Sequence, residues 1–421
     1  MKAAIISVLC ICVFATTAGA TKVRGAACST HLTGVSLQSI AADRSGNVYV
    51  TGYGSAPGIF VAKLNPAGKV VYSEYIGTTG SGSGIAVDWS GNAYVTGSTS
   101  GGLPTTAHVL QPNLGDDSFC GNSDAFVIKL NSQGKLSYAT YLGGQCIDFG
   151  AGIAVDFQGN AYVTGLTTGA FPTTPNAINN NAICAEFCGF VAKIDAKARS
   201  LVYSDYLGTF DVDPSSIALD LFGHAYVTGT TNTNFITTPN AFQPDWPGGL
   251  EQFEPFVAKL DLSGNSLAYG TYLGGEVCNL CGGFGRGLGI AVNLLGEAYI
   301  AGVTADGFPT TPNAFQPTFG GQRDGFVTKF NRTASSLDYS TYIGGTDTDS
   351  ANDIAVDLLG NAYVLWGTSG SDLHVAKLNA NGTSLIDLAD VGPQAVKIAA
   401  DYFGNVYVAT SDGAVIKIRG Q

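Results

Sequence analysis

Short apolar runs rich in Val, Ile, Tyr and Thr alternate with breaks of Gly, Asn and Asp along almost the whole chain. The segment DFQGNAYVTG at residues 156–165 is representative, because an acid and a Gly lead into the strand-like run AYVT. Runs of this length, bounded by turn residues, predict β-strands joined by tight turns.

This motif occurs seven times. Its copies begin at Asp43, Asp88, Asp156, Asp220, Asn293, Asp357 and Asp401. Each is preceded by an apolar run such as GIAVD and followed by one of the type FVAKLN; in the first six units a further run of the type LSYATYLGG comes next. Four short strands make one antiparallel sheet, which cannot bury both faces alone, whereas seven sheets packed in a ring can. The sequence therefore predicts an all-β, seven-bladed β-propeller with four antiparallel strands per blade.

The predicted propeller occupies residues 21–421 as a single domain. We expect its blades at about 35–77, 84–143, 151–208, 215–274, 287–344, 351–391 and 394–419. The last unit has only three strands before the chain ends. We expect an N-terminal strand within residues 27–34 to supply the fourth, which would join the first blade to the last.

The unit GIAVDxxGNAYVTG, followed by FPTTPNAFQP, DAFVAKLN and LxYSTYLGG, resembles the bacterial seven-bladed β-propeller repeat known as the SBBP repeat. The resemblance covers nearly all of residues 21–421. It implies the propeller fold and an exported bacterial protein, and it implies no activity. The first two strands also bear a weaker likeness to NHL-repeat and virginiamycin-lyase-like propellers.

Residues present in every blade are expected to be architectural. Asp and Gly of the D-x-x-G segment suit the first and fourth positions of a type I turn. A Lys follows in the third strand of each unit, and we expect it to pair with the turn acid of its own blade, as Lys259 would with Asp220.

The N-terminus has the features of an export signal. A positive start, the apolar run AAIISVLCICVFATTA and the small residues Ala18–Ala20 predict a signal peptide over 1–20, cleaved near Ala20. We therefore expect a secreted, periplasmic or cell-surface protein with no membrane span. The net charge of −12 argues against nucleic acid as a partner, because phosphate binding needs clustered Lys and Arg.

Function is sought where the blades differ. Blades two to five carry insertions between strands two and three, such as FPTTPNAFQP, which could cradle a ligand or cover blade edges. Half of the acids, 16 of 32, fall in these loops, in the connections between blades and at the adjoining strand starts. This end of the propeller is expected to be negative and to attract basic partners. The candidate ligand- or partner-binding residues are Trp246, Phe253, Asp116, Asp117, Asp211 and Asp213.

No cofactor is predicted, apart from calcium as a candidate ligand. Asp347, Asp349 and Asp353 of TDTDSAND alternate with other residues, as calcium ligands do, but fall short of a full ligand set. The alternative for this segment is a solvated acidic loop.

Seven Cys residues follow the predicted cleavage point, and export favours disulfides. Cys120 and Cys146 fall in loops at the same end of adjacent blades, so we expect them to pair. Local bridges are expected within Cys184–Cys188 and within Cys278–Cys281, with a four-thiolate zinc site as the alternative.

The sequence thus predicts an exported, non-catalytic binding or scaffold module. Its partner would be a protein or cell-envelope component, which could be basic; the sequence leaves the oligomeric state open. The alternative is a propeller-type lyase or hydrolase with its site at the mouth of the central channel. Only four His residues occur, and no G-x-S-x-G or H-E-x-x-H motif is present.

Overall fold

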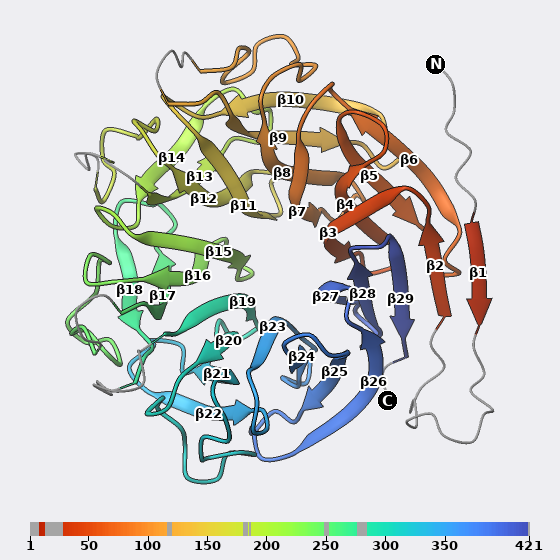
Figure 1. The fold of residues 1–421 in the computed structure, drawn as a ribbon. Coiled ribbons are helices and arrows are strands. Elements are labelled where there is room, and N and C mark those ends of the chain that lie inside the picture. The colour runs from red at the N-terminus through yellow and green to blue at the C-terminus, as the bar shows by residue number, and fades with distance from the viewer. Residues whose placement is uncertain are drawn as a thin grey trace.

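The computed structural model describes residues 8–12, 28–115, 120–179, 184, 187–247, 252–275 and 284–419. Seven antiparallel sheets form a ring around a central axis, and the described residues contain no helix (Figure 1). The all-β, seven-bladed propeller with four strands per blade is therefore confirmed.

In blades one to six the strands run outward from the axis in chain order, and in blade seven the N-terminal strand β2 lies outside β27, β28 and β29. The innermost strands are β3 (Val35–Ala42), β7 (Ser81–Val87), β11 (Asp148–Val155), β15 (Val212–Leu219), β19 (Arg286–Val292), β23 (Asp349–Val356) and β27 (Ala395–Ala400). The second strands are β4 (Val48–Gly54), β8 (Ala93–Thr99), β12 (Ala161–Thr167), β16 (Ala225–Thr231), β20 (Ala298–Thr304), β24 (Ala362–Thr368) and β28 (Val406–Thr410).

The third strands, which carry the repeated Lys, are β5 (Ile59–Leu64), β9 (Asp124–Leu130), β13 (Cys188–Ile194), β17 (Glu254–Leu260), β21 (Asp324–Phe330), β25 (Leu373–Leu378) and β29 (Ala414–Ile418). The outermost strands are β6 (Val70–Ile76), β10 (Leu136–Leu142), β14 (Leu201–Tyr206), β18 (Leu267–Tyr272), β22 (Leu337–Ile343), β26 (Leu385–Gly392) and, in blade seven, β2 (Cys28–Leu32). We call the end with the turns between strands one and two, and three and four, the turn face. The opposite end is the loop face.

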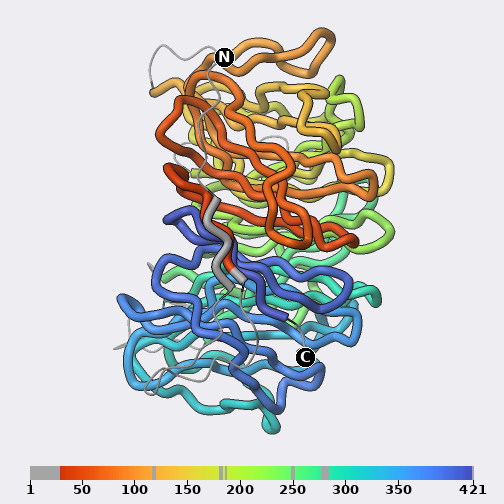
Figure 2. Tube along the Cα trace, turned by 90° about the vertical axis from the view of Figure 1, so that its right-hand side faces the viewer, coloured from red at the N-terminus to blue at the C-terminus, as the bar shows by residue number. Residues whose placement is uncertain are grey.

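The ring is closed by an N-terminal strand, as predicted. Strand β2 pairs antiparallel with β29, with Cys28 opposite Lys417 and His31 opposite Ala414. Figure 2 shows the disc from its edge, with the N-terminal (red) and C-terminal (blue) strands next to each other. A further strand, β1 (Val8–Cys12), pairs antiparallel with the outer edge of β2. This fifth strand, within the predicted signal peptide, was not anticipated.

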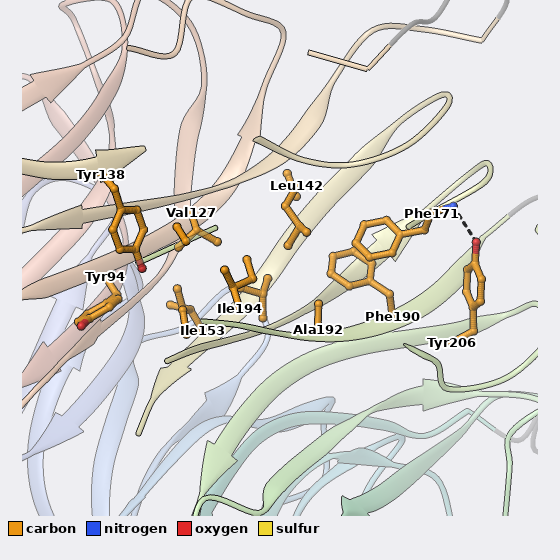
Figure 3. Packing of buried hydrophobic residues seen from close by; sticks show 14 of the residues in the cluster. Tyr94, Val127, Tyr138, Leu142, Ile153, Phe171, Phe190, Ala192, Ile194 and Tyr206 are labelled. Atoms are coloured by element: carbon orange, nitrogen blue, oxygen red, sulfur yellow. Dashed lines mark hydrogen bonds between the residues drawn. The ribbon is translucent and has the colours of Figure 1, made fainter. Parts of the chain in front are cut away.

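The hydrophobic core is divided among the seven interfaces between blades. Each interface contains one cluster of buried side chains drawn from two neighbouring sheets. Between blades two and three, Tyr138 and Val127 face Ile153, and Phe171 stacks on Phe190 with ring centroids 4.0 Å apart (Figure 3). Because every sheet is covered on both faces, second and third strands are buried along almost their entire length.

Six of the seven repeated turns hold their shape through one carboxylate, and in blade five the side-chain amide oxygen of Asn293 takes its place. In blade three, Oδ1 of Asp156 accepts the backbone N–H groups of Gln158 and Asn160, at 3.0 and 2.9 Å. Its Oδ2 accepts the Asn160 amide at 2.8 Å and the Tyr162 hydroxyl at 3.1 Å. The N–H of Gly159, whose φ of 83° favours glycine, donates to the Asp156 carbonyl and completes the predicted turn.

The repeated Lys completes this cluster in blades three, four and six, where the predicted Lys–Asp pairing is confirmed. In blade five, where Asn293 stands in place of the acid, Lys329 pairs with Glu297 at 2.8 Å instead. Nζ of Lys259 lies 3.5 Å from Asp220, and corresponding pairs form between Lys193 and Asp156 and between Lys377 and Asp357. In all seven blades the ammonium also lies over the ring of the motif Tyr, between 4.6 and 5.5 Å from its centroid.

The motif Tyr also joins one blade to the next. The Tyr162 hydroxyl lies 3.0 Å from the carbonyl of Gly223, in the turn of blade four. Four other Tyr residues make the same contact, in the pairs Tyr49–Gly91, Tyr226–Gly296, Tyr299–Gly360 and Tyr407–Gly46. The last pair connects blade seven to blade one, across 361 positions of sequence.

The insertions of blades two to five cover outer strand edges. In blade two, the Thr106 N–H donates to Ala139 and the Tyr141 N–H to Gln111, both across the edge of β10. The Leu110 N–H then donates to Ala198 in the next blade. The insertions at Phe242 and Phe315 bond to the following blade in the same way, through Ala334 and Gly382. Of the two roles considered, cradling a ligand or covering blade edges, these contacts support the second. They satisfy backbone groups of the outer strand edges that would otherwise be free to pair with another strand.

One buried acid gives the fold a pH dependence. Glu254, at the start of β17, is 4% exposed, and its burial raises the pKa of the carboxyl to about 8. The folded protein therefore holds a proton on Glu254 at pH values where the unfolded chain has lost it.

Removing only the hydroxyl of the blade-joining Tyr should weaken the ring. Tyr162→Phe leaves the Asp156 and Gly223 oxygens without this donor, so we expect the free energy of unfolding to fall by about 1–3 kcal/mol. Urea denaturation followed by fluorescence would measure the change. Tyr53→Phe, at a side chain 48% exposed, is the matched control and should shift the midpoint little. Equal midpoints for Tyr162→Phe and wild type would contradict the assigned role.

Glu254→Gln should remove part of the loss of stability at rising pH. Between pH 4.5 and about 8 the folded state binds a proton that the unfolded state does not, so wild-type stability falls as pH rises through this range. The amide cannot ionise, so the melting temperature of the variant minus that of wild type should rise with pH across the same range. Glu74→Gln, on the exposed part of β6, is the control. Parallel pH profiles for Glu254→Gln and wild type would refute the assignment.

Candidate binding site

A pocket of about 300 Å³ opens on the loop face, over blades three, four and five. Its apolar wall is made by Leu166 of β12, Val212 of β15 and two aromatic side chains, Phe187 and Phe253. Both aromatic residues immediately precede a third strand, β13 in blade three and β17 in blade four. They are 55% and 38% exposed, so their rings are available to a ligand.

The acidic side of the pocket is held by a strained turn at Asp211. This residue has a φ of 52°, rare for a residue with a side chain, and its N–H donates to the Phe187 carbonyl at 2.8 Å. The Asn232 amide donates to Oδ2 of Asp211 at 2.7 Å. These two contacts fix the carboxylate beside Phe187.

The opposite side of the pocket is basic. Arg286 begins β19, and its guanidinium lies 4.7 Å from the ring centroid of Phe284. Arg323 lies 4.2 Å from the same centroid. Phe284 is itself fixed by a bridge to Phe253, in which the Gly285 N–H donates to the Phe253 carbonyl at 2.7 Å. The Phe284 ring, which is held beside Phe253, therefore places the guanidinium groups of Arg286 and Arg323 next to the pocket.

The charges in the pocket influence each other. The Asp213 side chain is exposed to solvent, yet the surrounding protein partly desolvates its carboxyl and so raises its pKa. The nearby Arg286 guanidinium opposes that shift. The pocket thus offers two aromatic faces, two carboxylates and one guanidinium. This set can hold an apolar group beside a cation or hydrogen-bond donor, with Arg286 facing a carbonyl or carboxylate.

The structure brings together three of the predicted binding residues and separates the rest. Phe253, Asp211 and Asp213 line the one pocket. Trp246 instead packs edge-on against Tyr272 of β18, with centroids 5.1 Å apart, as part of the cover over blade four. Asp116 and Asp117 lie outside the described residues.

The three acids of the predicted calcium loop do not converge. Oδ2 of Asp349 accepts the Gly345 N–H at 2.6 Å, and its Oδ1 accepts the Thr368 hydroxyl. Asp353 turns towards the central channel, where it accepts the Ile398 N–H and meets Lys397 at 3.3 Å. A bulge in β23 between Ala351 and Asp353 lies between the two residues whose side chains point in different directions, Asp349 and Asp353. Asp347 is exposed in the loop before β23. Within the described residues, no three His, Cys, Asp or Glu side chains are placed to hold a metal ion.

Two disulfides stabilise the loop face. Cys120 is bonded to Cys146 across blades two and three, and Cys184 is bonded locally to Cys188. Cys184 and Cys188 are therefore not zinc ligands here. Cys278 and Cys281 lie outside the described residues.

The loop face carries less surface charge than its sequence implies. Of the sixteen acids that the sequence analysis placed at this end, the structure describes eleven, and six of these are buried: Asp124, Asp148, Glu254, Asp324, Asp349 and Asp353. Asp124, for example, binds the Gln111 amide at 2.8 Å and the Gly115 N–H at 2.9 Å, which ties an insertion to β9. Acids at strand starts thus serve the fold, and the exposed acids include Asp213, Asp245, Asp306 and Asp347.

The surface that the central channel exposes is mostly polar, although its lining includes Ile side chains. A space of about 160 Å³ within it is lined by Ser and Gly residues and by one Ile from each blade: Ile40, Ile85, Ile153, Ile217, Ile290, Ile354 and Ile398. The Asp353–Lys397 pair supplies the charged groups of this lining.

The sequence analysis assigned no role to Arg286 or Arg323, and it missed Phe187 and Phe284. A usable signal was present, because Phe187 and Phe253 occupy equivalent positions just before the third strands of consecutive blades. Their approach to Asp211 and Arg286 depends on how neighbouring blades meet, which the repeat alone does not show.

Comparison with known proteins agrees with this architecture. The SBBP β-propeller repeat matches residues 30–59, 71–104, 138–172, 202–236 and 338–373. A regulatory protein, FlaEY of Caulobacter vibrioides, is 24% identical over 376 residues, which are 86% of this chain and 38% of that protein. The chain thus spans well under half of this relative.

Solved propellers share the fold at low sequence identity. The WD40 domain of Neurospora crassa Pan2 covers 94% of this chain, and 96% of its own length is matched, with a TM-score of 0.53 and 10% identity. An inactive virginiamycin B lyase from Staphylococcus aureus, solved with quinupristin, covers 93% of this chain, and 99% of its own length is matched, with a TM-score of 0.52 and 10% identity.

No helix in the described part of the chain is long and apolar enough to cross a membrane. This chain therefore carries five matches to the SBBP β-propeller repeat and folds as a seven-bladed propeller.

Proposed function

We propose that this propeller is an exported binding or scaffold module that uses the pocket on its loop face. The observation that carries the proposal is the meeting of Phe187, Phe253, Asp211, Asp213 and Arg286 in one open recess. Aromatic faces next to fixed carboxylates suit a partner segment in which a basic residue neighbours an apolar one. We infer a protein or cell-envelope component of this kind as the partner.

Export is part of the proposal. The apolar run after Met1-Lys2 supports a signal peptide. The disulfides Cys120–Cys146 and Cys184–Cys188 support an oxidising compartment, since such bonds persist outside the cytosol.

Two further observations favour binding over catalysis. Among the described residues that line the channel space, Asp353 and Lys397 supply the charged groups and no His is present, whereas a lyase or hydrolase at the channel mouth would use converging His and acids. The description of the Caulobacter relative as a regulatory protein also fits a role in which the propeller recognises another molecule. Shared fold with a lyase does not carry its activity to this chain.

A fluorescent positional library of short peptides would test the pocket directly. We expect the wild-type chain to prefer peptides with Arg or Lys beside Trp, Phe or Leu. Asp211→Asn with Asp213→Asn should reduce affinity for these peptides by at least about tenfold, since the loss of charged hydrogen bonds costs about 1.5–3 kcal/mol. Phe253→Ser should weaken binding of every preferred peptide, because it removes an aromatic face.

The matched control is Asp245→Asn with Asp306→Asn, which removes two exposed acids from the same face but away from the pocket. An equal loss in the control would reassign the effect to overall charge. If wild type shows no peptide preference, or if Asp211→Asn with Asp213→Asn changes nothing, the pocket is not the binding site.

A further inference from the structure

The turn face carries an exposed apolar ring that the fold does not require. Ten of the fourteen residues between Asp (or Asn293) and Gly in the seven motif turns are large and apolar or aromatic, and each is at least 46% exposed. They are Trp89, Phe157, Leu221, Phe222, Leu294, Leu295, Leu358, Leu359, Tyr402 and Phe403. We call this set the apolar ring. It faces away from the candidate binding site on the loop face.

The turns themselves show that these side chains are not needed for folding. The structural contacts of each turn come from its Asp, Gly, Asn and Tyr, as in blade three. Blade one has Arg44 and Ser45 at the two free positions, and blade two has Ser90 at the second. Polar residues therefore fit the same backbone, which leaves the apolar choice in the other blades unexplained by the fold.

The ring surrounds one mouth of the channel and lies roughly in one plane. The turns follow the innermost strands, and these contact each other around the whole ring. Neighbouring turns also touch: the Trp89 and Phe157 rings lie 5.0 Å apart, and the Arg44 guanidinium lies 2.9 Å from the centroid of Trp89 and 5.9 Å from that of Tyr402. Equivalent positions in blades related by rotation about one axis share a height along that axis, so the ring suits a flat surface.

Exposed charge around the apolar ring is positive. The turns of this face, between strands one and two and between strands three and four, together with Arg419 after β29, contain seven Lys and Arg residues, all exposed: Arg44, Lys69, Lys135, Lys197, Arg199, Arg332 and Arg419. Their nine Asp and Glu residues are all buried or half-buried. These acids bond within their turns, as Asp195 does with the N–H groups of Lys197 and Arg199. The face thus shows a basic rim around an apolar centre.

We propose that the turn face docks on an anionic lipid surface, with the apolar ring entering the interface and the basic rim facing the headgroups. Trp, Tyr, Phe and Leu are the side chains that partition into membrane interfaces, and each nearby Lys or Arg adds electrostatic attraction to acidic lipids. A bilayer is flat on the scale of the ring, so all blades can insert together. A second copy meeting this face symmetrically would bring two basic rims together, which disfavours that occupant.

This proposal concerns the face opposite the candidate binding site and stands apart from the proposed function. If both hold, one face rests on the membrane while the pocket faces away from it.

Vesicle sedimentation with the full chain tests the proposal. The key variant is Phe222→Ser, Leu295→Ser, Leu359→Ser and Phe403→Ser, which places at four turns the residue that Ser45 and Ser90 already supply in blades one and two. We expect wild type to sediment with phosphatidylglycerol–phosphatidylcholine vesicles. The variant should lose at least about tenfold in partition coefficient, since even partial burial of four such side chains exceeds the 1.4 kcal/mol of a tenfold change.

The matched control is Val71→Ser, Val202→Ser and Ile386→Ser, which removes exposed apolar groups from outer strands and should leave partitioning unchanged. All variants keep the same apolar N-terminal segment, so its contribution cancels. Lys69→Gln, Lys135→Gln, Lys197→Gln and Arg332→Gln should weaken binding to the anionic vesicles, with little effect on phosphatidylcholine alone.

Three results would overturn the proposal. One is wild type that does not sediment with anionic vesicles; another is a ring variant that partitions as wild type does. The third is wild type that ignores vesicles but forms dimers in analytical ultracentrifugation that the ring variant lacks, which would identify a second copy as the occupant.

Discussion

The ring depends on hydrogen bonds made by the hydroxyl of the motif Tyr. This hydroxyl lies between the carboxylate of the turn in its own blade and a Gly carbonyl in the turn of the next blade. In blade three this is Tyr162 between Asp156 and Gly223. Within one blade the carboxylate shapes a turn; across two blades the same hydroxyl sets their spacing. A single hydroxyl proton lies between the carboxylate oxygen and the carbonyl oxygen, so the shape of the turn and the interface between blades are coupled. The Tyr407–Gly46 contact extends this coupling to the interface between blade seven and blade one.

This coupling explains why the fold could be predicted so completely. Each blade repeats the same Gly, Tyr and Lys, together with an Asp or, in blade five, an Asn. Blade number, strand order and the closing role of the N-terminal strand β2 therefore follow from counting motif copies, as do the Lys–Asp pairs of blades three, four and six. Strand β1 could not be predicted in this way, because it carries no motif and is specified only by the free edge of β2.

The candidate site was predictable only in part, for a related physical reason. Phe253, Asp211 and Asp213 stood out as departures from the repeat, but their neighbours Phe187 and Arg286 come from other blades, and the meeting point depends on how sheets are offset. Acids were harder still. Asp124 and Asp324 look like surface charge in the sequence, yet each lies buried and binds a Gln amide and a Gly N–H of its insertion. Charge at a strand start is thus a poor guide to surface potential.

The two faces of the disc diverge because the fold constrains them differently. On the turn face the backbone fixes Asp and Gly but leaves two positions per turn free, and rotation about the axis turns any preference there into a planar ring. On the loop face, insertions and disulfides differ from blade to blade, so an asymmetric recess such as the Phe187–Arg286 pocket can form. Repetition favours broad, flat contacts, while its interruption favours a specific one. A propeller of this kind can therefore combine attachment to a surface with selective recognition, using the same scaffold for both.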